Sequence, residues 1–324
     1  MNRLLWGITT TKFIILSLDE IKRVRQITIG IPSYNEEKNI TNLLHALERQ
    51  HLHSRIRQVI IADDSSDRTP ELVERFTSRS SLPISLLHRD GRRGASAAWN
   101  EIFRRANGDA LVLYDADIIP HPSCTERLAS GVKGRVGICA SNPLPFDPAG
   151  IPGRASKFIS DWLGSVRLER VSQYTVMGRA LSIKTSAARR IRIPEETIAV
   201  DLYLQYKVME LGLDVEYDNE AIVYFRPPGS MPDLASQVAR AANGHRQLRR
   251  HASKSKIGLP LRTAAAKALR GAFRDPVGAA STVLGFAVIP YYKSRLAEAG
   301  VSSFKWHTAS SSKALDYQKL RSNF

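Results

Sequence analysis

Two carboxylates follow a short apolar segment in the middle of the chain. The segment Leu111–Tyr114 has the composition of a buried strand, and Asp115 and Asp117 come directly after it. Residues two apart on a strand share one face, so both carboxylates can point at one ligand. Mg²⁺ prefers oxygen ligands and often takes one or two carboxylates plus substrate phosphates. The pair therefore predicts a metal–diphosphate site, and a solvated acidic loop before a helix near His121 is the alternative.

Polar clusters also follow two earlier apolar segments. Gln26–Ile31 and Val59–Ala62 are expected strands, and Pro32–Glu36 and Asp63–Asp67 come directly after them. Apolar residues recur at helical spacing between the strands, so strands and helices alternate through about residue 140. That alternation predicts a parallel sheet with helices on both faces. Ligands of such sheets bind beyond the carboxyl ends of the strands, where we expect the three polar clusters to converge.

The turn after the first strand contains no glycine, which argues against the commonest nucleotide-binding loops. It reads Pro-Ser-Tyr-Asn-Glu, whereas a dinucleotide-binding fold carries Gly-x-Gly-x-x-Gly there, and the sequence has no Walker loop. A cation on Asp117 and the basic loop with Arg92 and Arg93 could neutralise substrate phosphates instead. The alternative for Arg92 and Arg93 is an ordinary solvated loop.

Together these motifs resemble the family-2 glycosyltransferases, which have the GT-A fold. The resemblance covers roughly residues 26–250. It rests on the order and spacing of Pro32-Ser-Tyr-Asn-Glu36, Asp63-Asp64-Ser-Ser-Asp-Arg-Thr69, Arg93-Gly94 with Asn100, Gly108-Asp109 and Asp115-Ala-Asp117. It implies an α/β fold with a mostly parallel central sheet flanked by helices. It also implies a nucleotide-sugar donor and a divalent cation, Mg²⁺ or Mn²⁺.

The resemblance assigns roles to individual side chains. Asp64 would hold the base or its ribose. Asp115 would lie near the ribose and diphosphate and would share the metal with Asp117. The other expected nucleotide-sugar contacts are Pro32, Tyr34, Glu36 and Arg93. Turn and N-cap chemistry is the alternative for Asp63 and Asp67, and we favour it for Asp67, which precedes Thr69-Pro70.

A later segment resembles the part of the family that carries its catalytic base. The family usually has Glu-Asp-x-x-Leu there, and the aspartate is the base. In this chain Val200 replaces the glutamate and Asp201 remains. The resemblance thus implies Asp201 as the catalytic residue. The alternative is a helix N-terminal aspartate stabilised by the helix dipole, and both can hold together.

Other segments on the acceptor side match the family only in part. Gln237 and Arg240 fit the Gln-x-x-Arg-Trp of processive members, but Ala241 replaces the tryptophan, which weakens the case for processive synthesis. We expect Gln237 and Arg240 as diphosphate or acceptor contacts. Tyr174–Ile183 resembles the family's acceptor-side strand. Pro143–Pro152 reads as a long loop, followed by a helix over about 155–171.

The positive charge of the chain is concentrated at its C-terminal end. Residues 240–324 hold 16 Lys/Arg against 3 Asp/Glu, a net charge of +13 out of +16 for the whole chain. Basic segments of this kind bind anionic lipid or nucleic acid. Because the tail lacks the interleaved aromatic residues of a stacking platform, no nucleic acid is expected as a partner. The two cysteines have neither disulfide nor metal spacing and fit a reducing, cytosolic setting.

An uncharged run of 17 residues, Pro276–Tyr292, lies in this basic region. A spanning helix needs about 20 apolar residues, so the run is a marginal transmembrane segment. A helix buried against the catalytic domain and an interfacial helix are the alternatives. We favour the interfacial, monotopic arrangement, with flanking cations and with Tyr291 and Tyr292 at the boundary. The start of the chain shows no signal peptide.

These observations predict an N-terminal extension (1–25), a GT-A catalytic domain (26–250) and a basic, helical, membrane-associating extension (251–324). The predicted activity is inverting transfer of a sugar from a UDP- or GDP-sugar to a lipid-linked, glycan or polyprenyl-phosphate acceptor, at the cytosolic face of an anionic membrane. Asp201 would deprotonate a hydroxyl acceptor, whereas a polyprenyl phosphate is already ionised.

Two other functions stay open at this point. A nucleotidyltransferase acting on a sugar phosphate would normally carry a glycine-rich turn after its first strand, which this chain lacks. A non-enzymatic basic protein that binds membranes or nucleic acid would show salt-sensitive binding by residues 240–324 alone. That second function leaves the acidic strand ends unexplained.

Overall fold

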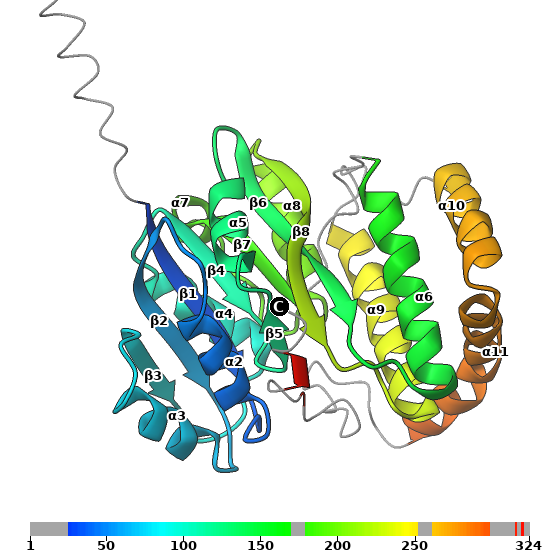
Figure 1. Cartoon of the computed structure of the whole chain (residues 1–324), viewed down its shortest axis with the longest axis horizontal. Coiled ribbons are helices and arrows are strands. Elements are labelled where there is room, and N and C mark those ends of the chain that lie inside the picture. The colour runs from blue at the N-terminus through cyan, green and yellow to red at the C-terminus, as the bar shows by residue number, and fades with distance from the viewer. Residues whose placement is uncertain (1–24, 170–178, 252–260, 299–314, 316–318, 321–324) are drawn as a thin grey trace, which may run out of the picture.

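The computed structural model describes residues 25–169, 179–251, 261–298, 315 and 319–320 (Figure 1). An eight-stranded sheet with the order β3-β2-β1-β4-β7-β6-β8-β5 runs through these residues. Its strands are β1 (Gln26–Ser33), β2 (Arg55–Asp63), β3 (Ile84–His88), β4 (Ala110–Tyr114), β5 (Ile118–Pro120), β6 (Val136–Pro145), β7 (Ala180–Lys184) and β8 (Asp214–Phe225). Neighbouring strands are parallel from β3 to β4 and between β6 and β8. β7 is antiparallel to both of its neighbours, and β5 is antiparallel to β8.

Helices cover both faces of the sheet, as the alternating pattern predicted. One apolar cluster joins the sheet to α2 (Ile40–Glu48), α3 (Thr69–Thr77) and α5 (Cys124–Gly131). A second cluster on the opposite face joins it to α4 (Ala95–Arg105), α7 (Thr185–Ala188) and α8 (Val200–Glu210). Four further helices lie together at one end of the sheet (Figure 1): α6 (Gly150–Arg167), α9 (Met231–His251), α10 (Leu261–Arg274) and α11 (Pro276–Glu298).

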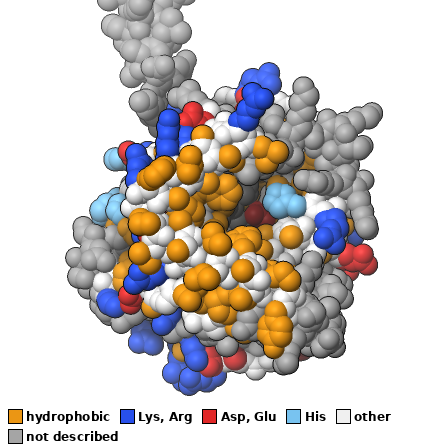
Figure 2. Space-filling view, turned by 90° about the vertical axis from the view of Figure 1, so that its right-hand side faces the viewer, with side chains coloured by type: hydrophobic (Ala, Val, Ile, Leu, Met, Phe, Trp, Pro, Cys, Tyr) orange, Lys and Arg blue, Asp and Glu red, His pale blue; other side chains and the backbone are white. Residues whose placement is uncertain are grey.

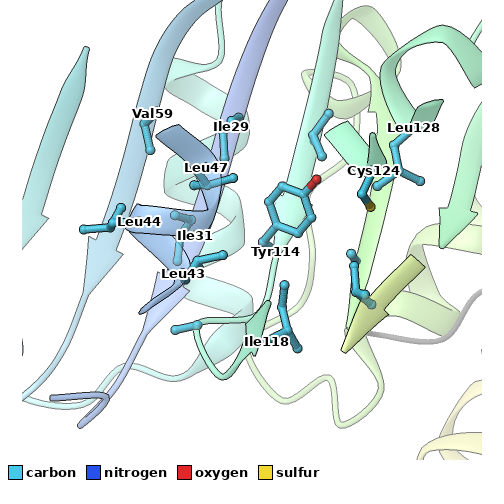
Figure 3. Close-up of a cluster of buried hydrophobic side chains, with 14 of the residues drawn as sticks. Ile29, Ile31, Leu43, Leu44, Leu47, Val59, Tyr114, Ile118, Cys124 and Leu128 are labelled. Atoms are coloured by element: carbon cyan, nitrogen blue, oxygen red, sulfur yellow. The ribbon is translucent and has the colours of Figure 1, made fainter. Parts of the chain in front are cut away.

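The strand sequences fill both cores because successive side chains point to opposite faces. In β4, Val112 and Tyr114 belong to the first cluster, whereas Leu111 and Leu113 belong to the second. Figure 3 shows the first cluster, in which isoleucines of β1 and leucines of α2 lie beside Tyr114. This burial fixes the position at which β4 ends, and therefore the place of the two carboxylates that follow it.

The chain differs from the sequence prediction mainly at its prolines. β1 continues through Pro32, because the carbonyl of Ser33 still accepts a hydrogen bond from the backbone N–H of Asp64 (3.1 Å). Pro143 and Pro145 lie within β6. Pro152 lies in the first turn of α6, where its fixed φ suits a helix. The expected loop from 143 to 152 is therefore wrong: only residues 146–149 separate β6 from α6.

One other predicted boundary also moves, and β8 is a single strand whose pairing with β6 is irregular. The helix expected near His121 begins at Cys124, after the short strand β5. The first half of the predicted strand Tyr174–Ile183 lies outside the described residues, and its end belongs to β7. Nearly all of the predicted segment 1–25 also lies outside them.

The C-terminal helices pack on the rest of the protein. α10 and α11 contact α6, and α11 also contacts α9. The indole Nε1 of Trp162 on α6 donates a hydrogen bond to the carbonyl of Ala264 on α10 (2.8 Å). Leu315 and Leu320 are buried against Ala46 of α2. Within the described ranges, no helix combines the length and the apolar character needed to cross a bilayer, and this holds for the run 276–292 in α11. The domain division at residue 250 stays a prediction.

Candidate functional site

A cleft lies beyond the carboxyl ends of β1, β2 and β3. It has a volume of about 350 Å³ and is lined by Tyr34, Asp64, Ser65, Ser66, Asp67, Pro70, His88, Asp90, Gly91 and Arg92. The first two predicted polar clusters, after β1 and β2, therefore meet in one place. The loop after β3, which carries the basic residues, forms the third wall.

Hydrogen bonds join the loops that follow β1 and β2. The backbone N–H of Asn35 donates to the hydroxyl of Ser65 (2.7 Å), and the N–H of Ser66 donates to the Asn35 side-chain oxygen (2.9 Å). Asn35 has a positive φ of 53°, a conformation that asparagine tolerates better than most residues. The N–H of Glu36 donates to the hydroxyl of Thr69 (2.9 Å). The two loops are thus fixed to each other before any ligand enters.

Asp64 is buried, and its carboxylate holds the basic loop in place. One oxygen, Oδ1, pairs with the guanidinium of Arg89 (Nη2–Oδ1 2.6 Å). The other, Oδ2, accepts hydrogen bonds from the backbone N–H groups of Arg93 (2.8 Å) and Gly94 (3.3 Å). Asp63 is buried beside it and accepts hydrogen bonds from the hydroxyl of Ser65. The two carboxylates therefore determine the shape of the cleft wall.

The remaining predicted nucleotide contacts lie around this cleft. The guanidinium of Arg92 stacks over the Tyr34 ring, 4.1 Å from its centroid. Arg93 is exposed, and Pro32 is partly buried in β1. The Glu36 carboxylate accepts a hydrogen bond from the Asn39 side chain (2.9 Å) at the start of α2. Asp67 accepts hydrogen bonds from Thr69, as the turn interpretation predicted.

A second group of charged side chains collects after β4. Asp115, Asp117, Asp201, Arg179 and Arg240 form one electrostatically interacting cluster, although they come from four parts of the chain. Burial raises the pKa of Asp115 well above its usual range, and the adjacent Asp117 carboxylate adds to this rise. The two guanidinium groups act in the opposite direction. Such crowding of like charges is typical of functional sites rather than of solvated loops.

Arg179 is the member of this cluster that sequence reasoning missed. Its guanidinium lies 3.7 Å from Asp117 (Nη1–Oδ2) and stacks on the Phe225 ring at 3.8 Å. Its carbonyl accepts a hydrogen bond from the backbone N–H of Asp115 (2.9 Å). The antiparallel pairing of β7 with β4 produces this contact. Because that pairing joins segments about 65 residues apart through tertiary structure, no local motif signals it.

Asp201 lies in the first turn of α8, as the helix interpretation predicted, and it also faces the charged cluster. Burial raises the pKa of its carboxyl. Hydrogen bonds from backbone N–H groups at the helix start, and the charges of Arg240 and His245, act in the opposite direction. The net result is a carboxylate more basic than an ordinary aspartate, which suits a group that accepts a proton.

Side chains of α4 and α9 hold the segment that leads into α8. The amide of Asn100 binds both backbone groups of Ile193 (2.8 and 2.9 Å). The amide of Gln247 donates to the carbonyl of Glu196 (2.8 Å) and accepts from the N–H of Ile198 (2.9 Å). Sequence reasoning gave Asn100 no role and missed Gln247. Both lie far from residue 201 in sequence and act on backbone atoms, which leave no motif.

Close packing of α9 also fixes this segment. A Cβ at Gly244 would lie 2.5 Å from the Ala199 Cβ, so only glycine allows this approach. Arg240 lies one turn earlier on the same helix, and Gln237 one turn before that, partly exposed. The predicted Gln-x-x-Arg pair therefore lies within α9 rather than at its start.

The oxygen donors at the end of β4 fit a divalent cation that completes its ligands from a substrate. Asp115 and Asp117 supply two carboxylates, and a cation would relieve the repulsion between them. Within the part of the chain that the structure describes, no group of three or more His, Cys, Asp or Glu side chains could hold a metal by itself. Mg²⁺ and Mn²⁺ bound through a diphosphate need no more protein ligands than this.

Comparison with known sequences agrees with this geometry. Residues 28–186 match the family model described as glycosyl transferase family 2. The chain is 23% identical over 240 residues to a probable glycosyltransferase, YdaM, of Bacillus subtilis, which covers 70% of this chain and 57% of that protein. It is 30% identical over 108 residues to a dolichol-phosphate mannosyltransferase of Pyrococcus furiosus, which covers 33% of this chain and 30% of that protein. The chain thus spans little more than half the length of the first relative.

Comparison with solved structures identifies the fold. The mannosyltransferase PcManGT of Pyrobaculum calidifontis, solved in complex with GDP-Man and Mn²⁺, aligns with a TM-score of 0.59 at 17% identity, over 86% of this chain and 81% of that one. At this identity the likeness concerns the fold, which is GT-A. The matched residues 28–186 run from β1 into α7 and include both carboxylates after β4. Over residues 28–186 the chain therefore belongs to glycosyl transferase family 2.

Proposed function

We propose that this protein transfers a sugar from a nucleoside-diphosphate sugar to an acceptor, with inversion at the anomeric carbon. The observation that carries the proposal is the cluster of Asp115, Asp117 and Asp201 with two arginines, next to a cleft built from the ends of β1 to β3. The cleft offers an aromatic ring and backbone groups, which suit a nucleoside. The cluster offers carboxylates for a cation and a base, which suit group transfer.

The donor nucleoside binds in the cleft. Its base and ribose lie between Tyr34 and Asp64, and the basic loop with Arg92 and Arg93 lies on the diphosphate side. Pro32 and Glu36 support this wall from β1 and from the start of α2. Hydrogen bonds already fix the loops, so donor binding requires little ordering of the protein. UDP- and GDP-sugars both fit this description.

Asp115 and Asp117 would hold Mg²⁺ or Mn²⁺ at the end of β4. Such a cation would offset the negative charge that develops on the departing diphosphate. The structural relative PcManGT was solved with Mn²⁺, which supports this assignment. Arg179 orients Asp117 through their ion pair, and Arg240 adds positive charge on the diphosphate side of the cluster. Gln237, one turn away, is a further acceptor or diphosphate contact.

Asp201 acts on the acceptor. It takes the proton from the acceptor hydroxyl while the acceptor oxygen forms a bond to the anomeric carbon and the bond from that carbon to the diphosphate oxygen breaks. The raised pKa of Asp201 favours this proton transfer. With a phosphate acceptor the attacking oxygen is already ionised, and Asp201 then positions the acceptor without taking a proton.

The acceptor is a lipid-linked sugar, a glycan or a polyprenyl phosphate, reached at the cytosolic face of an anionic membrane. The match to a dolichol-phosphate mannosyltransferase supports a lipid phosphate, although it covers only 33% of this chain. The +13 charge of residues 240–324 supports association with anionic lipid.

A panel of UDP- and GDP-sugars with Mg²⁺ or Mn²⁺ tests the proposal through nucleoside diphosphate release. One donor should be consumed in a metal-dependent reaction, and Asp117→Asn should abolish metal-dependent donor binding in calorimetry. Lys133→Glu, on an exposed turn, is the control and should bind normally. Binding of donor and Mn²⁺ by Asp117→Asn as tight as wild type would refute the metal assignment. Pyrophosphate release from a nucleoside triphosphate and a sugar phosphate would establish the nucleotidyltransferase instead.

A further inference from the structure

The inward side of helix α11 consists mostly of small residues, and most of its large apolar residues lie outward. Its buried positions are Gly278, Ser281, Gly285 and Ile289, which recur at helical spacing and form one side of the helix. At Gly285 a Cβ would lie 3.1 Å from Leu234 of α9, so the small residue lets α11 approach closely. Its outer side consists of Val277, Val283, Leu284, Phe286 and Val288, with 38–69% of each residue exposed.

The neighbouring helix α10 has the same arrangement. Ala264 is buried against α6, and a Cβ at Gly271 would touch the Phe158 ring at 3.4 Å. Leu269 and Phe273, four residues apart and therefore on one side, are 62% and 81% exposed. Small inward and large outward residues on two adjacent helices oppose the usual order of a water-facing helix, where apolar residues turn toward the core.

Basic residues accompany this apolar surface. On α10, Arg270 directly follows Leu269 and Arg274 directly follows Phe273. The two arginines therefore form a row beside the row of apolar residues. Both are exposed. Lys267 pairs with Glu169 at the end of α6 (2.5 Å) and so belongs to the inner side. Tyr291, 57% exposed, follows the outward apolar residues in the second half of α11. Outward apolar residues, flanking arginines and a boundary tyrosine are typical of a helix lying in a membrane interface.

Figure 2 views the protein from the side on which α10 and α11 lie. Hydrophobic side chains gather over most of this face, and Lys and Arg side chains appear at its edges. Contiguous exposed apolar patches of this kind mark interaction surfaces, whereas exposed apolar residues that stand singly are normal on a protein surface. The same face is hollowed, with an acidic side chain on the floor of the hollow and a histidine at its rim.

We propose that the outward face of α10 and α11 docks on the surface of an anionic lipid bilayer. The occupant is lipid rather than a protein because large apolar side chains stand out from both helices and exposed arginines border them on one side, which suits an anionic surface with an apolar interior. This inference rests on the proposed function in one respect: a lipid-borne acceptor would reach the acidic hollow from the docked face. The apolar residues enter the interface, and Arg270 and Arg274 contact lipid phosphates.

Vesicle sedimentation tests the proposal with the full chain. Wild type should sediment with vesicles of phosphatidylcholine and phosphatidylglycerol at 7:3, and weakly with phosphatidylcholine alone. The double variant Phe273→Glu, Leu284→Glu should lose binding to both. Arg270→Glu with Arg274→Glu should weaken binding to the anionic vesicles by at least about 30-fold, which is two contributions of about 1 kcal/mol. Lys133→Glu with Arg190→Glu changes the net charge equally at exposed sites on other elements and should bind like wild type.

Donor turnover, measured as nucleoside diphosphate release without vesicles, separates this inference from the proposed function. Both face variants should keep normal turnover and an unchanged melting temperature. Normal turnover with no vesicle binding by wild type would overturn the inference alone. Vesicle binding without turnover of any donor would leave the inference standing and refute the proposed function. A wild-type dimer in light scattering that the face variants convert to monomer, with no vesicle binding, would assign the face to a second copy and overturn the inference.

Discussion

The helices α2 and α11 bury opposite kinds of side chain. α2 turns its large residues Ile40, Leu43, Leu44 and Leu47 toward the sheet, where all four are buried (Figure 3). α11 turns glycine and serine toward its neighbours and leaves its valines, a leucine and a phenylalanine outside. Both helices are rich in apolar residues, so composition does not distinguish them. What differs is the side of each helix on which the large apolar residues lie.

The comparison extends to the polar residues of the two regions. Around the cleft, carboxylates are enclosed by hydrogen bonds, as at Asp64, and their positions are fixed by neighbouring loops. On α10 the exposed arginines stand beside apolar side chains and face outward. The preformed geometry of the first region suits a small ligand, whereas the second region suits an extended surface that needs charge and apolar area but no exact shape. Variants in one region should therefore leave the other region's property unchanged.

The largest effect should come from Asp201→Asn. The rate of sugar transfer to a hydroxyl acceptor should fall by about 10²–10⁴-fold, because the substitution removes the general base and hardly changes shape. Donor affinity and vesicle binding should stay near wild type. Steady-state kinetics, calorimetry and vesicle sedimentation measure the three properties. Near-normal turnover would show that Asp201 is not the base. It would indicate a phosphate acceptor or another carboxylate as the base, such as Glu195 or Glu196.

The pH profile of the wild type gives a second check on the same residue. Transfer should fall on the acidic side as Asp201 takes up a proton. Because burial raises the pKa of this carboxyl, the loss should begin at a higher pH than for an ordinary aspartate. An acidic limb at the ordinary position of an aspartate would contradict this expectation.

The stabilities of two leucine variants should differ just as the helix comparison predicts. Leu43→Ala should lower the free energy of unfolding by about 2–5 kcal/mol, because Leu43 is fully buried in the sheet core. Leu284→Ala on α11 should change it by no more than about 0.5 kcal/mol, since Leu284 is 55% exposed. Urea unfolding in the absence of lipid measures both. Equal losses would show that α11 is part of an ordinary core.

A smaller effect, on nucleotide binding, is expected when the basic loop with Arg92 and Arg93 loses the carboxylate of Asp64. Asp64→Ala should weaken binding of the free nucleoside diphosphate by about 1–3 kcal/mol, the usual result of removing one partner from buried hydrogen bonds. Arg89 and the N–H groups of Arg93 and Gly94 lose their acceptor in this variant. Calorimetry gives the dissociation constant. Glu71→Ala, at an exposed position of α3, is the control and should bind like wild type. An unchanged dissociation constant would leave Asp64 with a structural role only.

The smallest effect should come from the residue that positions Asp201 through its backbone. Gln247→Leu removes two hydrogen bonds to the segment 196–198, each worth about 0.5–1.5 kcal/mol. The turnover number should fall about tenfold and the acidic limb of the pH profile should move, while donor affinity stays unchanged. Rescue by Gln247→Asn is not expected, because the shorter amide cannot reach both backbone groups. A loss of stability without a change in the pH profile would indicate support of the fold alone.

The sequence alone predicts the alternation of strands and helices, the family, and the polar clusters at the strand ends. These features are local: buried strands read as apolar runs, and Asp115 and Asp117 are two residues apart. For the same reason the turn role of Asp67 was visible, since its partner Thr69 lies two residues away. The prolines of β6 misled the prediction because a proline stops a strand only where its missing N–H would have been needed.

The contacts between charged side chains, and the helix faces that are exposed, can be seen only in the tertiary structure. Arg179 reaches Asp117 because β7 pairs antiparallel with β4, and Gln247 reaches the start of α8 because α9 crosses it. The sequence likewise left open whether 276–292 spans, lies on a membrane or is buried. The packing of α11 shows which of its side chains face the protein: glycine, serine and Ile289 lie inward, and the other large apolar side chains lie outward. Long-range pairing and helix orientation depend on the sum of many contacts, which no single segment encodes.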